Sequence, residues 1–140
     1  GGLVSGIAIA LKTECPNITV YAVEPIGFDS MTRSIATGRP SGNRPGAHSI
    51  CDALQPPRTG DFTFEICKKY LTGGITLDDN AVKRAMRVAF NEFKLVVEPG
   101  GCIALAAALE NKLNIKDRNV AVICSGGNVD PNVFTNAIRT

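Results

Sequence analysis

The chain has 140 residues, of which 44% are hydrophobic and 20% are charged, a composition typical of one soluble domain large enough to bury a core. Fifteen lysines and arginines against thirteen acidic residues leave a net charge of +2 without a basic block, so we expect no nucleic-acid partner. The longest hydrophobic run, residues 102–109, is far shorter than the roughly 20 residues that span a bilayer, so we expect no membrane partner.

The first part of the chain predicts two helices around one strand. Hydrophobic residues at three-to-four spacing follow the opening glycines and indicate a helix that ends near Glu14. Residues 19–23 are β-branched and aromatic, which favours a buried strand. A second helix is expected over residues 28–37, with Gly38 ending it.

The middle of the chain predicts a long connection followed by a helix and a strand. Residues 38–60 are rich in proline and glycine, so we expect an irregular segment, with a short strand at 49–51. Residues 61–71 begin with an acidic cap and carry helical periodicity. A short strand is expected at 75–77.

The last part of the chain contains the clearest periodic signal. Asp78 or Asp79 caps a helix, and its expected buried face consists of Val82, Met86, Ala89, Phe90 and Phe93. Further along we expect an extended segment at 95–97, an alanine-rich helix over 99–113, a buried strand at 120–124 and a last helix from residue 131.

This alternation of strands and helices predicts an α/β fold with a mostly parallel sheet flanked by helices. In such sheets, ligands bind at the carboxyl ends of the strands. The turn at Ser125 and Gly126 follows the predicted last strand and is therefore a candidate ligand site, although glycine there could serve only the geometry of the turn.

Other segments of the chain allow a functional and a structural interpretation. Gly1 and Gly2 lead into a helix, as in an anion-binding turn or a plain loop. Glu98 is either a functional carboxylate or a helix cap before Pro99. Glu24, with Asp29 nearby in the sequence, suits a hard divalent cation, but both could be surface acids.

Cysteine and histidine usage narrows the chemistry. The five cysteines form no Cys-x-x-Cys pair, so we expect reduced thiols in a cytoplasmic protein. His48 is the single histidine, and no metal cluster or Ser-His-Asp arrangement is expected around it. The chain opens on Gly1 without a methionine or a leader, so we expect a cut start.

The order of several segments is more specific than any one of them: GGLVSGIA, YAVEPIGFDS, ICDAL, FTFEI, KLVVEPGGCIALAAAL and ICSGGNVDP. This order closely resembles the carboxyl-terminal half of the catalytic region of the threonine/serine dehydratases and serine racemases. These are tryptophan-synthase-β-like enzymes, of fold type II, that use pyridoxal phosphate. The resemblance covers essentially all 140 residues and implies that residues 1–140 are a single partial domain, part of the large domain of such an enzyme.

The resemblance also implies roles for particular residues. Gly1, Gly2 and Leu3 match the end of the segment that holds the cofactor phosphate through backbone N–H groups. Ser125 matches the serine that hydrogen-bonds the pyridine nitrogen. The remaining cofactor-binding residues implied are Glu98 and Gly126, beside the ring.

A cation site is implied in the same way. Glu24, the main-chain carbonyl of Phe28 and the position of Ser30 match a site for Mg²⁺ or Ca²⁺ in several relatives. An acidic residue usually stands at the position of Ser30, and the loss of one carboxylate weakens a site for a hard cation.

The resemblance implies deamination of L-threonine or L-serine to a 2-oxo acid and ammonia, in an intact enzyme that is a homo-oligomer. The lysine that forms the Schiff base matches no lysine of this sequence, so we expect the isolated chain to be inactive, with no catalytic residue of its own. Two alternatives remain open. One is a serine racemase or another fold type II enzyme, and the other is a non-catalytic folded remnant that binds at most an anion.

Overall fold

A computed structural model describes residues 1–139, which divide into two compact units. The first unit consists of Gly1–Ala47 and Gln55–Thr76, and the second consists of His48–Leu54 and the chain from Leu77 onward. Over the described residues, the search for a membrane-crossing helix finds none that is long and apolar enough.

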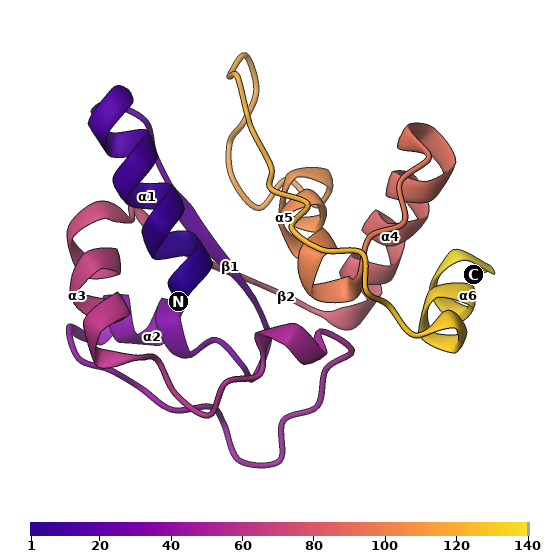
Figure 1. The fold of residues 1–140 in the computed structure, drawn as a ribbon, viewed down its shortest axis with the longest axis horizontal. Coiled ribbons are helices and arrows are strands. Elements are labelled where there is room, and N and C mark those ends of the chain that lie inside the picture. The colour runs from indigo at the N-terminus through magenta and orange to yellow at the C-terminus, as the bar shows by residue number, and fades with distance from the viewer. Residues whose placement is uncertain (140) are drawn as a thin grey trace. The chain divides into compact units, whose positions relative to one another are not determined.

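The first unit packs three helices and a two-stranded sheet. Its helices are α1 (Gly2–Glu14), α2 (Ser30–Thr37) and α3 (Asp61–Tyr70), and its strands are β1 (Tyr21–Pro25) and β2 (Gly73–Leu77), which pair in one sheet (Figure 1). Helix α3 packs against α1 and α2, and α2 packs against β1. The buried residues of the core are Ala8, Val20, Ala22, Met31, Cys67 and Leu71.

Local chemistry explains where these helices end. Gly38 follows α2 with a φ of 74°, and its N–H donates to the carbonyl of Ser34, as expected for a glycine that stops a helix.

The predicted strand at 19–23 forms two residues later, as β1, and the predicted strand at 75–77 forms as the end of β2.

The second unit consists mainly of helices: η1 (Asp52–Leu54), α4 (Asp79–Phe93), α5 (Pro99–Leu109) and α6 (Pro131–Arg139). Helix α4 packs against α5 and α6, and η1 packs against α5. Most of α5 is buried, because its glycines and alanines let neighbouring segments approach closely.

The predicted buried face of α4 is confirmed at Val82, Met86 and Ala89, which are fully buried. It is wrong at Phe90 and Phe93, which are 37% and 57% exposed. The ring of Phe90 instead meets Phe134 of α6 edge to face, with the ring centres 5.5 Å apart.

Two other predictions differ from the structure. Residues 49–51 form no strand, and the short helix η1 follows them. Helix α5 ends at Leu109 instead of 113, because Asn111 adopts a φ of 49°. Residues 95–97, predicted only to be extended, lie between α4 and α5 and belong to no helix or strand.

The prediction of a buried strand at 120–124 is wrong for the described residues. These five residues belong to no strand, and Val120 and Ile123 are 49% and 46% exposed. A strand needs a neighbour to take its backbone hydrogen bonds and to cover its faces, and no neighbour among residues 1–139 pairs with this segment.

The predicted fold class is confirmed: the chain has an α/β fold with a parallel sheet flanked by helices. The expectation that residues 1–140 form a single partial domain stays a prediction.

The close approach of β2 to α2 gives a test of the first unit. A β-carbon at Gly74 would lie 2.1 Å from Oγ1 and 2.9 Å from Cα of Thr32, whereas one at Gly73 would touch nothing closer than 3.8 Å. We therefore expect Gly74→Ala to lower the free energy of unfolding by about 1–3 kcal/mol, as overpacking does. Gly73→Ala is the matched control in urea denaturation, and equal midpoints for the two variants would contradict this packing.

Candidate functional site

The turn predicted to bind the cofactor ring is built where two backbone segments of the second unit cross. The N–H of Glu98 donates to the carbonyl of Gly126 at 2.9 Å. A β-carbon at Gly101 would lie 2.8 Å from both the nitrogen and the oxygen of Gly126, and one at Gly127 would lie 2.7 Å from the carbonyl oxygen of Val96. Glycine is therefore required at positions 101 and 127 because a backbone occupies the space that a side chain would fill.

The crossing leaves two polar side chains at the turn. The carboxylate of Glu98 lies over Gly126, since a β-carbon there would be 2.7 Å from Oε1 of Glu98. Ser125 is exposed, and no residue of the described chain gives its hydroxyl a hydrogen-bond partner. The structure thus brings together Glu98 and Gly126, two residues for which the resemblance implies a common site, with the exposed hydroxyl of Ser125 next in the chain.

The second unit contains two buried thiols, those of Cys51 and Cys102. Burial raises the pKa of the Cys51 thiol to about 12, and it raises that of Cys102 to about 12 as well. Both thiols are therefore neutral at physiological pH, and they behave as small hydrophobic groups. Cys124, by contrast, is exposed.

The opening glycines lie at the amino-terminal end of α1, in the first unit. Gly1 occupies the cap position, and no side chain of the described residues caps the first turn. A β-carbon at Gly1 would lie 2.7 Å from Cε of Met31, while one at Gly2 would meet nothing within 4 Å. Gly2 and Leu3 are thus exposed residues in an uncapped first turn, at the helix end that favours an anion.

The predicted cation site is not supported. Oε1 of Glu24 accepts the N–H of Met31 at 2.9 Å, and Oε2 accepts the N–H and the hydroxyl of Thr32 at 2.7 and 2.6 Å. Glu24 thus caps the first turn of α2. In the part of the chain that the structure describes, no three His, Cys, Asp or Glu side chains gather where a metal could bind.

Of the other two positions predicted for the cation site, Ser30 uses its side chain within the fold, while Phe28 bonds through its N–H and not through the carbonyl that was predicted to bind the cation. The hydroxyl of Ser30 is buried and accepts a hydrogen bond from that of Thr59 at 3.1 Å. The N–H of Phe28 donates to the carbonyl of Pro25 at 3.0 Å, which closes the turn before α2. Asp29 is paired with Arg33 and Arg44.

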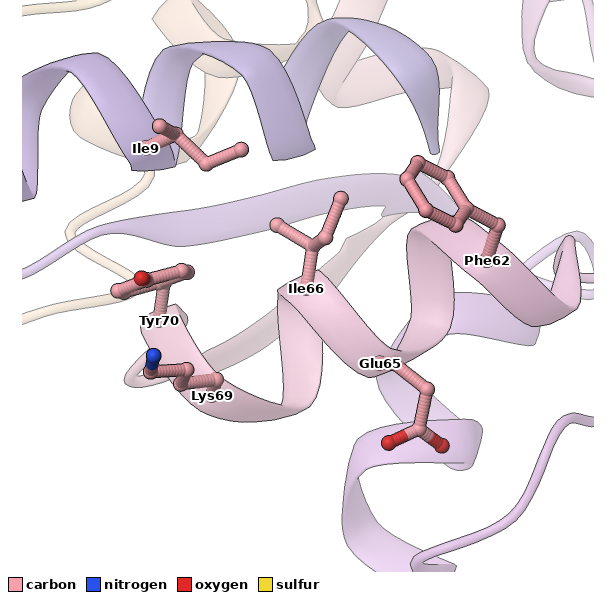
Figure 2. A pocket seen from close by; sticks show the side chains of 6 residues that line it. All are labelled: Ile9, Phe62, Glu65, Ile66, Lys69 and Tyr70. Carbon is pink, nitrogen blue, oxygen red and sulfur yellow. The ribbon is translucent and has the colours of Figure 1, made fainter.

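A separate hollow of about 380 Å³ lies between α1 and α3 of the first unit (Figure 2). Ile9 of α1 and Ile66 of α3 face each other across it, and Glu65 points away (Figure 2). None of the residues predicted to bind a cofactor or a metal lines it.

One polar cluster was missed by the sequence analysis. Asp78 caps α4 by accepting the N–H of Ala81 at 2.8 Å, so Asp79 is not needed as a cap. The carboxylate of Asp79 accepts the hydroxyl of Ser49 at 2.7 Å and the N–H of Ile50 at 3.1 Å. Only one of two adjacent aspartates is needed to cap α4, so the sequence left the other without an assigned role. It did not indicate what the second carboxylate would bind.

Comparison with known families identifies the chain. The family model described as "Pyridoxal-phosphate dependent enzyme" matches residues 1–126. The chain belongs to this family. The fold type II resemblance is thereby confirmed.

Similar proteins include both lyases and racemases. The chain is 33% identical over 139 residues to an L-threonine ammonia-lyase of Thermotoga maritima, covering 99% of the chain and 34% of that protein. It is 38% identical over 133 residues to a serine racemase of Dictyostelium discoideum, covering 93% of the chain and 41% of that protein. Among solved structures, a threonine deaminase of T.th. has a TM-score of 0.87 at 35% identity, with 93% of the chain and 46% of that structure covered.

The chain therefore spans between 34% and 41% of the length of these two curated relatives. Membership of the family implies pyridoxal phosphate in intact enzymes. The exposed hydroxyl at Ser125 and the uncapped backbone of α1 are chemically suited to its ring nitrogen and its phosphate, respectively.

The role of Glu24 can be tested with a chelator. We expect Glu24→Ala to lower the free energy of unfolding by about 1–3 kcal/mol, because the partly buried N–H groups of Met31 and Thr32 lose their acceptor. A metal ligand would show this loss only with metal present, whereas a cap shows it equally with and without EDTA. Glu24→Gln, which keeps one amide oxygen as acceptor, is the control and should lose less.

The raised thiol pKa values predict a loss of stability at high pH. Cys51 and Cys102 have an ordinary pKa of 9.0 and a folded value of about 12. Below pH 9 the thiols are protonated in both states, and between pH 9 and about 12 only the unfolded chain releases these protons. The free energy of unfolding should therefore fall across this range.

Urea denaturation at several pH values measures this slope. Cys102→Ala should make the slope shallower, because one buried thiol no longer ionises on unfolding. Cys15→Ala, which removes an exposed thiol of the first unit, is the matched control and should change the slope less than Cys102→Ala does. Identical slopes in the two variants would contradict the raised pKa of Cys102.

Proposed function

We propose that this chain forms part of the catalytic region of a pyridoxal-phosphate-dependent ammonia-lyase that deaminates L-threonine or L-serine to a 2-oxo acid and ammonia. Membership of the family and the 33% identity to an L-threonine ammonia-lyase support the proposal. An amino-acid substrate is consistent with the family.

The observation that carries this proposal is the exposed, unpartnered hydroxyl of Ser125 beside the Glu98–Gly126 crossing of the described chain. When bound, pyridoxal phosphate supplies an electron sink for the bond-breaking steps at the amino acid. A hydroxyl at the ring nitrogen can hydrogen-bond to it without holding a proton there, as a carboxylate would. The milder electron sink that results favours loss of a β-hydroxyl group over transamination.

Other residues hold the cofactor in this proposal. The backbone N–H groups of Gly1, Gly2 and Leu3 would bind the phosphate, because the start of α1 has a positive dipole end and an uncapped first turn. Glu98 would lie beside the ring, and Gly126 would keep the turn flat enough for the ring to approach.

The lysine that forms the Schiff base is not among these residues. Such a lysine is activated by desolvation or by a neighbouring cation. Lys68, Lys69, Lys94, Lys112 and Lys116 are all exposed to solvent, and Lys83 is half-buried on α4. Lys12 is half-buried but donates to the carbonyl of Pro16. We therefore propose that the isolated chain is inactive.

Serine racemisation is the second candidate function. The 38% identity to a serine racemase favours it specifically. Ser125 suits both reactions, because each begins with removal of the α proton from the bound amino acid. A cytoplasmic location and a homo-oligomeric enzyme stay predictions, and the free state of all five cysteines supports the first of them.

Product analysis of the protein at its full encoded length tests the function. The purified protein is reconstituted with pyridoxal phosphate and incubated with L-threonine and with L-serine. A lyase releases 2-oxobutanoate from threonine and pyruvate from serine, and a racemase releases D-serine. A protein that gains no borohydride-sensitive absorbance band with the cofactor would overturn both candidates and favour a non-catalytic remnant.

Variants of Ser125 test whether its hydroxyl binds the ring nitrogen of the cofactor. Ser125→Ala should lower the rate of elimination by about 10- to 1,000-fold, because the ring nitrogen loses its partner. Ser125→Asp should protonate that nitrogen and shift the products toward racemisation or transamination. Thr135, a hydroxyl residue on α6 of the same unit, is changed to Ala and to Asp as the control and should keep the wild-type products. An unchanged product ratio in both Ser125 variants would contradict the assigned role.

A further inference from the structure

The carboxylate of Asp79 connects two segments that are far apart in the sequence of the second unit. Asp78, and not Asp79, caps α4. Oδ1 of Asp79 accepts the hydroxyl of Ser49 at 2.7 Å, and Oδ2 accepts the N–H of Ile50 at 3.1 Å. Both carboxylate oxygens are thus used to hold the end of the long connection before η1, and hydrogen bonds to a charged acceptor are the stronger kind.

The connection is fixed further by its own hydrogen bonds. The hydroxyl of Ser49 accepts the N–H of Cys51 at 3.1 Å, and the carbonyl of Cys51 accepts the N–H of Leu54 at 3.0 Å. The side chain of Cys51 is fully buried. The position of η1 therefore follows from where Asp79 holds Ser49 and Ile50.

The short helix η1 contacts the glycine segment at the start of α5. A β-carbon at Gly100 would lie 3.2 Å from Cγ of Leu54 and 3.4 Å from Cβ of Ala53. Gly100 is two residues from Glu98, whose N–H binds the carbonyl of Gly126. A displacement of η1 would therefore reach the Glu98–Gly126 crossing through packed atoms, since such interiors transmit strain.

We propose that Asp79 is a positioning residue for the cofactor site: by holding Ser49 and Ile50, it fixes η1 against Gly100 and thereby sets the place of Glu98 and Gly126. This inference rests on the proposed function, because the role of the crossing in cofactor binding is proposed there. Asp79 acts only through η1 and contacts neither the cofactor nor the substrate. Residues 43–51 form no strand, so no ladder of backbone hydrogen bonds between strands fixes this connection. The two hydrogen bonds to Asp79 hold its end instead.

The test compares Asp79→Asn with Asp78→Asn in the protein at its full encoded length. Both changes remove one negative charge at adjacent positions. Asparagine caps a helix about as well as aspartate, so Asp78→Asn keeps α4 and serves as the matched control. We call the hydrogen bonds of Asp79 to Ser49 and Ile50 the tether. Ser49→Ala removes the hydroxyl that Asp79 binds and should behave like Asp79→Asn.

The first readout needs no cofactor. The rate at which an alkylating reagent modifies Cys51 in the apoprotein is followed by peptide mapping, which separates Cys51 from all other cysteines. Opening of the connection exposes this buried, neutral thiol. We expect the rate to rise about 10-fold or more in Asp79→Asn and Ser49→Ala, and to stay near the wild-type rate in Asp78→Asn.

The second readout reports on the bound ring. We expect the dissociation constant for pyridoxal phosphate to rise about 10-fold in Asp79→Asn. We also expect the fluorescence spectrum of the saturated holoenzyme to shift, and neither change in Asp78→Asn. A purely structural role would lower the melting temperature but leave the spectrum of the folded, saturated enzyme unchanged.

Each outcome decides one question. Wild-type alkylation rates in Asp79→Asn would overturn the tether, and faster alkylation with an unchanged spectrum and affinity would overturn the positioning role. A wild-type protein that binds no pyridoxal phosphate would overturn the proposed function and the positioning role with it. The alkylation rates distinguish these failures, because they are measured without cofactor.

Discussion

The backbone of Gly126 passes so close to α5 that an atom added at Gly101 would lie 2.8 Å from its nitrogen and its oxygen. This approach is possible only because positions 101 and 127 lack side chains. It allows the N–H of Glu98 to bond the carbonyl of Gly126 and leaves Ser125 exposed at the end of an extended segment. The positions of Glu98 and Ser125 in the second unit are therefore set by contact between backbone segments, and not by flexible side chains.

Three carboxylates of this chain show why residue type alone did not determine function. Glu24 was a candidate metal ligand, but both of its oxygens bind the first turn of α2. Asp79 was a candidate cap, but its oxygens bind a connection about 30 residues earlier in the sequence. Glu98 precedes Pro99 as a cap would, yet it makes no side-chain cap bond within the described residues and lies over Gly126 instead. In each case the partner of the carboxylate lies outside the short sequence motif that contains the carboxylate, so the motif does not predict the contact.

The distance along the chain between interacting residues also decides which parts of the fold could be predicted from the sequence. Helix α4 was predicted well because its periodicity and its cap lie within the helix itself. Residues 120–124 have the composition of a buried strand, but a strand also requires a paired neighbour, which composition does not supply. The Glu98–Gly126 contact could be anticipated only from the order of motifs along the whole chain. The Asp79–Ser49 bond had no sequence signal beyond two adjacent aspartates, because the connection between its ends is irregular.

The distribution of buried polar groups separates the two units. Within the described chain, the buried polar and charged residues belong to the first unit: Ser5, Asp29, Ser30, Ser34 and Thr59. The interior of the second unit consists instead of small and aliphatic side chains and of neutral thiols such as Cys102. In the proposed function, the hydroxyl of Ser125 would meet the ring nitrogen at the edge of this interior, with Glu98 as the neighbouring carboxylate. Because that nitrogen takes part in both elimination and racemisation, the proposed role of Ser125 does not distinguish the two candidate functions, and the distinction would have to come from groups that contact the substrate.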